Sequence, residues 1–438
     1  MKFKKSGRAF LALVVSLGLS LGLTSCVNDF TVAYLYVTGS FQNQIGAFKI
    51  SNNTGNLSAI PGSPFGSGGT NPVRELVSPS GRFLYVLNAG TATTTNDNTT
   101  YASANITVYS VGGNGTLAFQ QSYTSQGFGS FRFGFNQGGS FLYVLDEYSP
   151  AAGGTTGSPT LTAGMSCQDA SGIFHPTGDV TVFSVDLNTG RLSLVTNNQV
   201  QNANGTSLSY FPVGCEPIDL KVTGADVLVA DTEDPVTGNK YTIFPYAESL
   251  TTGQLTVTQN TEFVTGAASI STIGSDAAAK YIYLLDPASE DIWYYTIGTN
   301  GLLQAVNGSP TSNVAQESVA GNPIAVTSDS KSKFLYVANA GPSSTNVTQP
   351  SSDISAFTIA ANGVLAPIAG APFPTGSGPQ CIIEDPSNQY LYTADHNSGT
   401  VSGHVLDPNS GVLTDMRNQS SYATVGSPTW CVADGHTD

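Results

Sequence analysis

Charged side chains are scarce in this 438-residue sequence: they make up 10% of it, and 15 Lys and Arg face 30 Asp and Glu. The formal net charge of -15 repels nucleic-acid phosphates, so nucleic-acid binding is not expected. The sequence also lacks a phosphate-cradling glycine loop, the serine elbow of α/β-hydrolases and a haem-type cysteine pair. These absences remove three common enzyme classes, and no cofactor is required by any motif.

The N-terminus has the pattern of an export signal. Four basic residues precede an apolar stretch over residues 9–23, which is too short to span a bilayer comfortably. The stretch runs into a Leu-Thr-Ser-Cys sequence that ends at Cys26 and resembles the lipobox of bacterial lipoproteins. We therefore expect residues 1–25 to be a lipoprotein signal peptide, Cys26 to be lipidated, and residues 26–30 to be a short tether.

An ordinary secretory signal with an incidental cysteine is the alternative, and under either interpretation the protein is exported. Acyl chains on Cys26 would anchor it to a bacterial membrane without a transmembrane helix. Val27, where Asp would favour retention at the inner membrane, points to the outer membrane, either its periplasmic side or the cell surface. Removal of residues 1–25 changes the formal charge from -15 to -19, because 11 basic residues then face 30 acidic ones.

The rest of the sequence is repetitive and rich in Gly, Ser, Thr and Asn. A Leu-Tyr-Val type of strand occurs seven times. The copies lie at residues 34–37, 83–86, 141–144, 227–229, 281–284, 334–337 and 390–393. Self-similarity of this kind indicates a repeat architecture.

Each copy is followed by a second β-rich run, a tight turn with Asn or Gly, a third strand, and an apolar fourth strand. Four strands per unit and seven units predict an all-β fold, a seven-bladed β-propeller formed by residues 31–438. The first unit lacks its apolar strand, and residues 428–434 match it. The C-terminal strand is therefore expected to complete blade one and close the ring.

The repeated strand, with Ser-Pro-Ser-Gly turns before it and Asn-Gly-Thr/Val-Leu turns after it, resembles the YVTN-type, lactonase-like β-propeller family over residues 31–434. That family includes 6-phosphogluconolactonase-like enzymes, a muconate-lactonising relative and surface proteins without proven chemistry. The resemblance implies the propeller fold. It leaves a lactone hydrolase and a non-catalytic propeller both open.

Three long inserts, residues 91–104, 149–179 and 341–352, each follow a Leu-Tyr-Val strand and should crowd one mouth of the central channel, the expected ligand site. Six of the strands end there in Asn or Asp. These residues are Asn88, Asp146, Asp231, Asp286, Asn339 and Asp395. They are either a ring that binds a cation or polyol, or side chains that cap strand ends through local amides.

Charged residues near the inner strands are the catalytic candidates, because lactone hydrolysis needs a base for water and a donor for the oxyanion. They are Arg74, Glu75, Arg132, Glu216, Asp219 and Glu317. The favoured pair is Glu216 with Arg132, with Arg74 as a further candidate and Asp219 as a ligand-binding one. Ion pairs that line a water-filled channel are the alternative.

The positions of the histidines in the sequence argue against catalysis. Lactonase-like enzymes of this fold tend to carry histidines in the lead-ins to inner strands, and this sequence has none there. Its four histidines are His175, His396, His404 and His436, without zinc-like spacing. His175 lies in an insert and is a conceivable loop-borne base or ligand contact. The acidic segments 231–234 and 290–291 could hold Ca²⁺, but no metal site is assigned.

Apart from Cys26, four cysteines remain and allow three pairings. We predict disulfides between Cys167 and Cys215 and between Cys381 and Cys431, the second acting as a clasp on the ring closure. Buried free thiols are the alternative, because inner strands of adjacent blades could be too far apart.

Two functions remain. One is an exported hydrolase for a sugar lactone or other lactone. The other is a surface propeller that binds a glycan, peptide or protein partner through its inserts. A monomer is expected in both cases. A quinone-binding redox propeller is disfavoured, because the sequence has only two Trp residues.

Overall fold

The computed structural model describes residues 30–95, 98–102, 104–150, 166–168, 174–201, 204–233, 241–257, 263–298, 301–312, 321–341 and 352–436. Every regular element in these residues is a β-strand. Across the same segments there is no helix long and apolar enough to cross a membrane.

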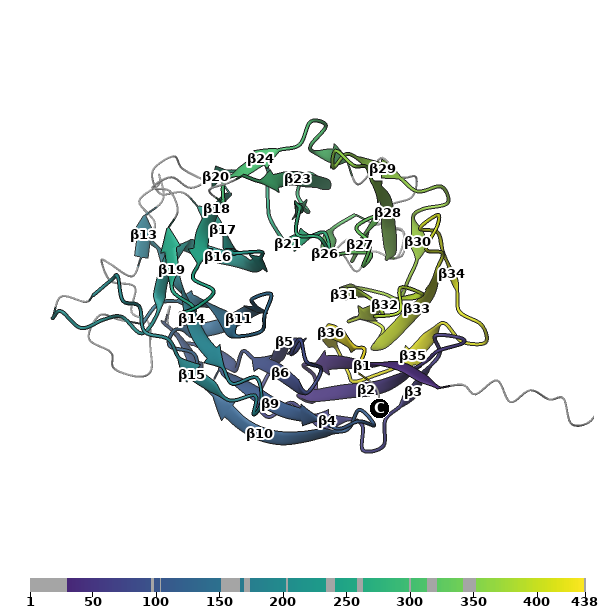
Figure 1. Ribbon diagram of the computed structural model, residues 1–438, viewed down its shortest axis with the longest axis horizontal. Helices are drawn as coiled ribbons and strands as arrows, with labels where there is room; N and C mark the ends of the chain where they lie inside the picture. Colours follow the sequence, from purple (N-terminus) through teal and green to yellow (C-terminus); the bar gives the residue numbers. More distant parts are fainter. Residues whose placement is uncertain are drawn as a thin grey trace, which may run out of the picture.

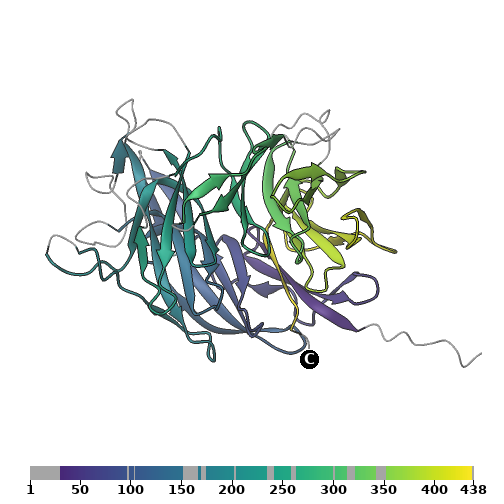
Figure 2. The same ribbon diagram turned by 45° about the horizontal axis from the view of Figure 1, so that its top comes forward.

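The strands form the predicted seven-bladed ring around a central channel (Figure 1), and they run between its two faces (Figure 2). From the channel outward, blade one consists of β36 (Pro428–Asp434), β1 (Thr31–Gly39), β2 (Gln44–Ser51) and β3 (Leu57–Ala59), and blade two consists of β5 (Pro72–Val77), β6 (Phe83–Asn88), β9 (Asn105–Val111) and β10 (Leu117–Tyr123). Blade three consists of β11 (Phe128–Phe135), β12 (Phe141–Tyr148), β14 (Phe174–Val185) and β15 (Leu192–Leu194). Blade four consists of β16 (Phe211–Thr223), β17 (Asp226–Glu233), β18 (Thr242–Glu248) and β19 (Leu255–Val257).

Blades five to seven are more regular. Blade five consists of β21 (Thr272–Ser275), β22 (Tyr281–Asp286), β23 (Asp291–Ile297) and β24 (Leu303–Ala305). Blade six consists of β26 (Pro323–Ser328), β27 (Phe334–Asn339), β28 (Asp353–Ile359) and β29 (Leu365–Pro367). Blade seven consists of β31 (Pro379–Glu384), β32 (Tyr390–Asp395), β33 (Thr400–Leu406) and β34 (Leu413–Asp415). Short outer strands add to five blades: β4 (Phe65–Gly66), β20 (Phe263–Val264), β25 (Thr311–Ser312), β30 (Phe373–Pro374) and β35 (Ser421–Ala423).

The repeated tyrosine explains why the Leu-Tyr-Val strand and the Asn-Gly turn recur together. Tyr36, Tyr85, Tyr336 and Tyr392 are fully buried. Each hydroxyl donates a hydrogen bond to the carbonyl of the turn glycine in the next blade. The acceptors are Gly115, Gly190, Gly411 and Gly55, at 2.9, 2.8, 2.9 and 2.6 Å. A buried hydroxyl needs such a partner, so the two motifs lock neighbouring blades together.

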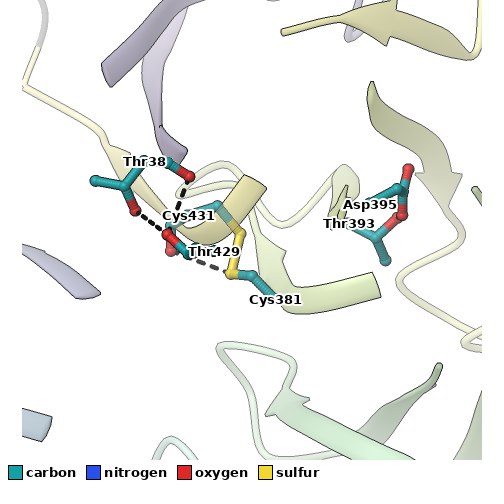
Figure 3. The surroundings of a disulfide bond; sticks show 6 residues. All are labelled: Thr38, Cys381, Thr393, Asp395, Thr429 and Cys431. Carbon is teal, nitrogen blue, oxygen red and sulfur yellow. Dashed lines mark hydrogen bonds between the residues drawn. A yellow bond between two sulfur atoms is a disulfide. The ribbon is translucent and has the colours of Figure 1, made fainter. Parts of the chain in front are cut away.

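Ring closure follows the prediction. β36 pairs antiparallel with β1, with Tyr36 opposite Val432, and supplies the inner strand of blade one. The predicted disulfide between Cys381 and Cys431 is present, with a Cα–Cα distance of 5.8 Å (Figure 3). Inner strands of adjacent blades are therefore close enough for a disulfide here.

Only one of the two cysteines in the second predicted disulfide has a described side chain. Cys215 is disulfide-bonded, while the side chain of its predicted partner Cys167 lies outside the described residues, as does Cys26.

Blades three and four depart from the regular pattern. β14 pairs with β12 of its own blade and also with β16 of the next, with Val180 opposite Phe211 and Thr177 opposite Cys215. One continuous sheet therefore spans two blades, a feature absent from the repeat pattern. The inserts add the hairpin β7 (Thr91–Thr95) and β8 (Asn98–Ala102), and β13 (Ser166–Gln168), which pairs with β14.

Candidate functional site

Two cavities occupy the central channel, one toward each face. The mouth cavity has a volume of about 290 Å³ and is lined by residues near the start of inner strands, including Val73, Ile324 and Gln380. This is the face of the inserts, because the inner strands begin opposite the ends of the Leu-Tyr-Val strands. The turn-side cavity, about 720 Å³, extends to the turns after the inner strands, including Pro79 and Ser330.

The predicted ligand site at the insert mouth thus corresponds to the smaller cavity. Arg74, Arg132 and Thr272 line both cavities and stand where the two meet.

Arg74, Arg132 and Thr272 occupy equivalent positions in their blades, and each of the other blades has a residue at the same position. The position follows a β-bulge in most inner strands and lies opposite the penultimate residue of the Leu-Tyr-Val strand. Its seven occupants are Trp430, Arg74, Arg132, Asp219, Thr272, Ala325 and Cys381. Cations, an anion and an aromatic ring therefore meet at one level of the channel.

Arg132 pairs with Asp219, whereas the pairing predicted from the sequence was with Glu216. Its Nε donates to Asp219 Oδ1 at 2.9 Å, and Asp219 Oδ2 accepts the Ile273 amide at 2.7 Å. The cause is the bulge between Pro217 and Asp219, which brings Asp219 to the shared position.

Glu216 lies off the channel. Its backbone φ is +40°, its Oε2 accepts a hydrogen bond from Thr232 Oγ1 at 2.7 Å, and it lines neither cavity.

Arg74 contacts the channel differently from Arg132. Its guanidinium stacks on the ring of Trp430 at 3.6 Å from the centroid. Within the described segments it has no ion pair or side-chain hydrogen bond. Burial, followed by the charge of Arg132, lowers the pKa of Arg74 well below its usual range. An anionic oxygen placed here would restore the stabilisation that Arg74 lacks.

His396 lines the mouth cavity together with Arg74 and Arg132, although the sequence interpretation did not choose it as a candidate site residue. Its Nδ1 lies 2.9 Å from the Pro428 carbonyl oxygen, which can only accept a hydrogen bond. The neutral ring therefore carries its proton on Nδ1 and its lone pair on Nε2. The available signal was position: His396 directly follows Asp395, the strand end on the insert face.

The other histidines are placed elsewhere. His404 is buried in blade seven, and burial lowers its pKa to about 4. His436, near the C-terminus, contacts Asp434. For His175 only the backbone is described, in the β13–β14 pairing opposite Cys167. Glu317 lies outside the described residues.

The six strand-ending Asn and Asp side chains are fully buried and line neither cavity. Asp146 accepts hydrogen bonds from Ser125 and the Gly127 amide, and burial raises its pKa to about 6. Asp286 accepts a hydrogen bond from the Ala268 amide at 2.7 Å, and Asp395 accepts one from the Ser402 hydroxyl at 2.7 Å. These local contacts match the capping interpretation. Asp231 is equally buried.

A metal site finds no support in the described part of the chain, where no group of three or more His, Cys, Asp or Glu side chains could hold an ion. The acidic turn from Asp231 extends partly outside the described residues. The ionisable side chains that line the two cavities are those of Arg74, Arg132, Asp219, Lys221, Asp276, Glu384 and His396.

Comparison with known proteins places the chain in a family. The family model described as "Lactonase, 7-bladed beta-propeller" matches residues 28–153 and 242–433, well over half of the chain. The protein belongs to this lactonase family of seven-bladed propellers. No curated protein sequence matches it.

Two solved structures illustrate the similarity. A Bacteroides fragilis protein assigned as a 6-phosphogluconolactonase has 16% identity and a TM-score of 0.63, covering 94% of this chain and 99% of that one. The periplasmic gluconolactonase of Pseudomonas aeruginosa has 16% identity and a TM-score of 0.64, covering 92% and 99%. At such identities these similarities establish the fold.

Proposed function

We propose that the protein hydrolyses a lactone in the mouth cavity, with His396 as general base and with Arg74 and Arg132 stabilising negative charge. The observation that carries this proposal is the oriented imidazole, whose Nδ1 is held by the Pro428 carbonyl and whose Nε2 is left to accept a proton. Family membership and the names of the similar structures support the reaction class.

In the proposed reaction, His396 Nε2 takes a proton from water as the water oxygen attacks the lactone carbonyl carbon. Arg74, without a carboxylate partner among the described residues, stabilises the charge that develops on the carbonyl oxygen. The ring C–O bond then breaks, and protonated His396 returns the proton to the leaving alkoxide. One lactone and one water give one hydroxy acid.

Arg132 serves to hold the substrate. Its guanidinium is fixed by Asp219 Oδ1 at 2.9 Å and by the Phe131 carbonyl at 3.1 Å, so its remaining N–H groups have a defined direction. Fixed donors bind hydroxyl or anionic oxygens of a sugar lactone without a further ordering cost.

The proposed location is outside the cytoplasm, with the chain anchored through lipids on Cys26. The disulfide between Cys381 and Cys431 supports this location, because such bonds persist mainly in oxidising compartments. Labelling with a radioactive fatty acid, compared between the natural chain and Cys26→Ser, tests the anchor directly. Equal labelling of both chains would contradict it.

The test of activity is pH-stat hydrolysis by the full-length protein on glucono-δ-lactone, 6-phosphogluconolactone and aliphatic lactones. We expect saturable turnover that falls about 10²- to 10⁴-fold in His396→Gln, the usual contribution of a general base. His436→Gln is the matched control, because His436 is largely exposed and lines neither cavity. Equal turnover by His396→Gln and the natural protein would contradict the role of His396.

The second candidate is a non-catalytic propeller that binds a glycan, peptide or protein partner at the same mouth. The β7–β8 hairpin favours it, because an extra two-stranded element at this face enlarges the surface available to a partner. Absence of turnover above buffer on every lactone would favour binding. Loss of glycan or protein capture on deletion of residues 91–102 would then identify the surface.

A further inference from the structure

The turn-side cavity is larger than the mouth cavity and takes no part in the proposed hydrolysis beyond the residues the two share. Polar and apolar side chains both line it, and the apolar ones include Leu76, Phe133, Phe135, Val326 and Trp430. A cavity of about 720 Å³ with such walls is large enough for a small organic molecule.

Lys221 places a positive charge in this cavity. It lies on β16, opposite Leu228, and lines the turn-side cavity but not the mouth cavity. The equivalent residues of the other six blades are uncharged. They are Val432, Leu76, Gly134, Gly274, Thr327 and Ile383. The repeat pattern therefore does not account for a lysine here.

The ammonium of Lys221 has no hydrogen-bond or ion-pair partner among the residues described. Burial lowers its pKa, partly offset by the charges of Asp219 and Asp276. An unpaired buried cation is costly, and a bound anion would compensate it.

The nearby carboxylates are already engaged. Asp219 pairs with Arg132. Asp276 Oδ1 accepts the amides of Lys280 and Tyr281, both at 2.7 Å. Glu384, whose pKa burial raises to about 8, is mainly neutral at pH 7. In a protein with a net charge of -15, this cavity brings together Lys221 and Arg74, neither of which has a direct ion-pair partner among the described residues.

We propose that the turn-side cavity binds an organic carboxylate with an apolar body, whose carboxylate pairs with Lys221 and whose body packs against Phe133, Phe135 and Trp430. The proposal does not depend on hydrolysis at the mouth cavity. It adds a second site that opens on the opposite face of the ring.

The experiment uses 4-phenylbutyrate as the probe and tryptophan fluorescence as the signal. Trp430 lines the turn-side cavity, whereas Trp293, the only other tryptophan, lines neither cavity and gives a constant background. We expect a saturable fluorescence change with 4-phenylbutyrate. The neutral isostere 4-phenylbutanamide should bind about 10- to 100-fold more weakly, the range expected for a hydrogen bond to a charged group.

Lys221→Met should weaken 4-phenylbutyrate binding by a similar factor, and Lys221→Arg should retain most of it. Lys333→Met is the control, because Lys333 is exposed and lines no cavity. Equal affinity of the acid and the amide for the natural protein would overturn the proposal. So would equal affinity of Lys221→Met and the natural protein, or the absence of saturable binding. The acid–amide comparison needs no variant and decides the question even if Lys221→Met misfolds.

Discussion

The two ends of the channel are built from the same strands but differ in how their polar groups are held. At the mouth, His396 is oriented by the Pro428 carbonyl, and Arg132 by Asp219. At the turn side, Lys221 has no partner among the described residues and lines the larger cavity. Oriented groups suit a reaction, because catalysis needs fixed geometry. An unpartnered charge suits binding, because its partner is the ligand.

Arg74 connects the two ends, and its replacement should affect both of them. Arg74→Met keeps a long apolar side chain against Trp430 but removes the charge. We expect lactone turnover to fall about 10²- to 10³-fold, as for loss of an oxyanion donor. Binding of 4-phenylbutyrate should weaken by a smaller factor, because Lys221 remains. The measurements are pH-stat rates and fluorescence titrations.

Arg82→Met is the matched control for that variant, since Arg82 is exposed and lines neither cavity. If Arg74→Met changed neither turnover nor binding, the two cavities would not share a functional cation and the comparison between them would fail.

The disulfide should matter for overall stability and for the mouth end. It closes a loop with a sequence separation of 50, and its removal costs up to about 4 kcal/mol in the chain-entropy model. For a chain of this size that lowers the Tm by about 5 °C. β36 carries both Cys431 and Pro428, so His396 should also lose its fixed orientation.

We expect the double variant Cys381→Ser, Cys431→Ser to show this Tm decrease in thermal unfolding, with a lower kcat at the mouth and an unchanged KM. Its Lys221-dependent binding of 4-phenylbutyrate should change less. An unaltered Tm would show that the ring closes through β36–β1 pairing alone.

A substitution of Glu75 should change the stability of the folded blades without changing turnover or ligand binding in the channel. Glu75 follows Arg74 on β5 but is fully buried and lines neither cavity. Within the described structure neither carboxyl oxygen has a well-formed hydrogen bond. Burial raises the pKa of Glu75 well above 4.5, and the Thr38 amide offsets this only in part. The carboxyl therefore contributes most stability below pH 4.5, and this contribution is lost as the pH rises toward its folded-state pKa.

Glu75→Met should consequently be more stable than the natural protein at pH 8, by about 1–3 kcal/mol. The difference should shrink toward pH 4.5. Chemical denaturation at several pH values measures it. Turnover and 4-phenylbutyrate binding should stay unchanged, and a decrease in either would place Glu75 in a functional site instead.

The fold was largely predictable, because its determinants repeat. The Leu-Tyr-Val type of strand and a turn glycine occur in each unit, and the contact between Tyr36 and Gly115 shows how the two motifs meet. The closure by β36 followed from one missing strand in the first unit. The continuous sheet through β14 and β16 was not predictable, because it depends on a local extension of strands that no other blade has.

The candidate site was less predictable for two physical reasons. A bulge between Pro217 and Asp219 places Asp219 opposite Ala230, where it meets Arg132. His396 reaches the mouth from the end of a second strand, whereas only the lead-ins to inner strands were considered. The bulge forms between two strands of one blade, and His396 is held at the mouth by its contact with Pro428 of the neighbouring blade.

Glu384 offers the finest test of the difference between the two ends. It lines only the turn-side cavity, and its Oε2 accepts the Ser330 amide at 2.7 Å. Its pKa is raised to about 8, mainly by burial and also by Asp329 and Asp385, while the Ser330 hydrogen bond and Lys331 act in the opposite direction. Above this pH the carboxylate becomes charged and repels a bound anion.

Affinity for 4-phenylbutyrate should therefore fall several-fold between about pH 7 and pH 9, since one added charge at close range costs roughly 1 kcal/mol in a solvated cavity. Glu384→Gln should match the natural protein at pH 7 and bind more tightly than it at pH 9. Some loss with pH will remain in the variant, because Lys221 also has a lowered pKa. Identical pH profiles for the two proteins would remove Glu384 from the site and leave Lys221 as the titrating group there.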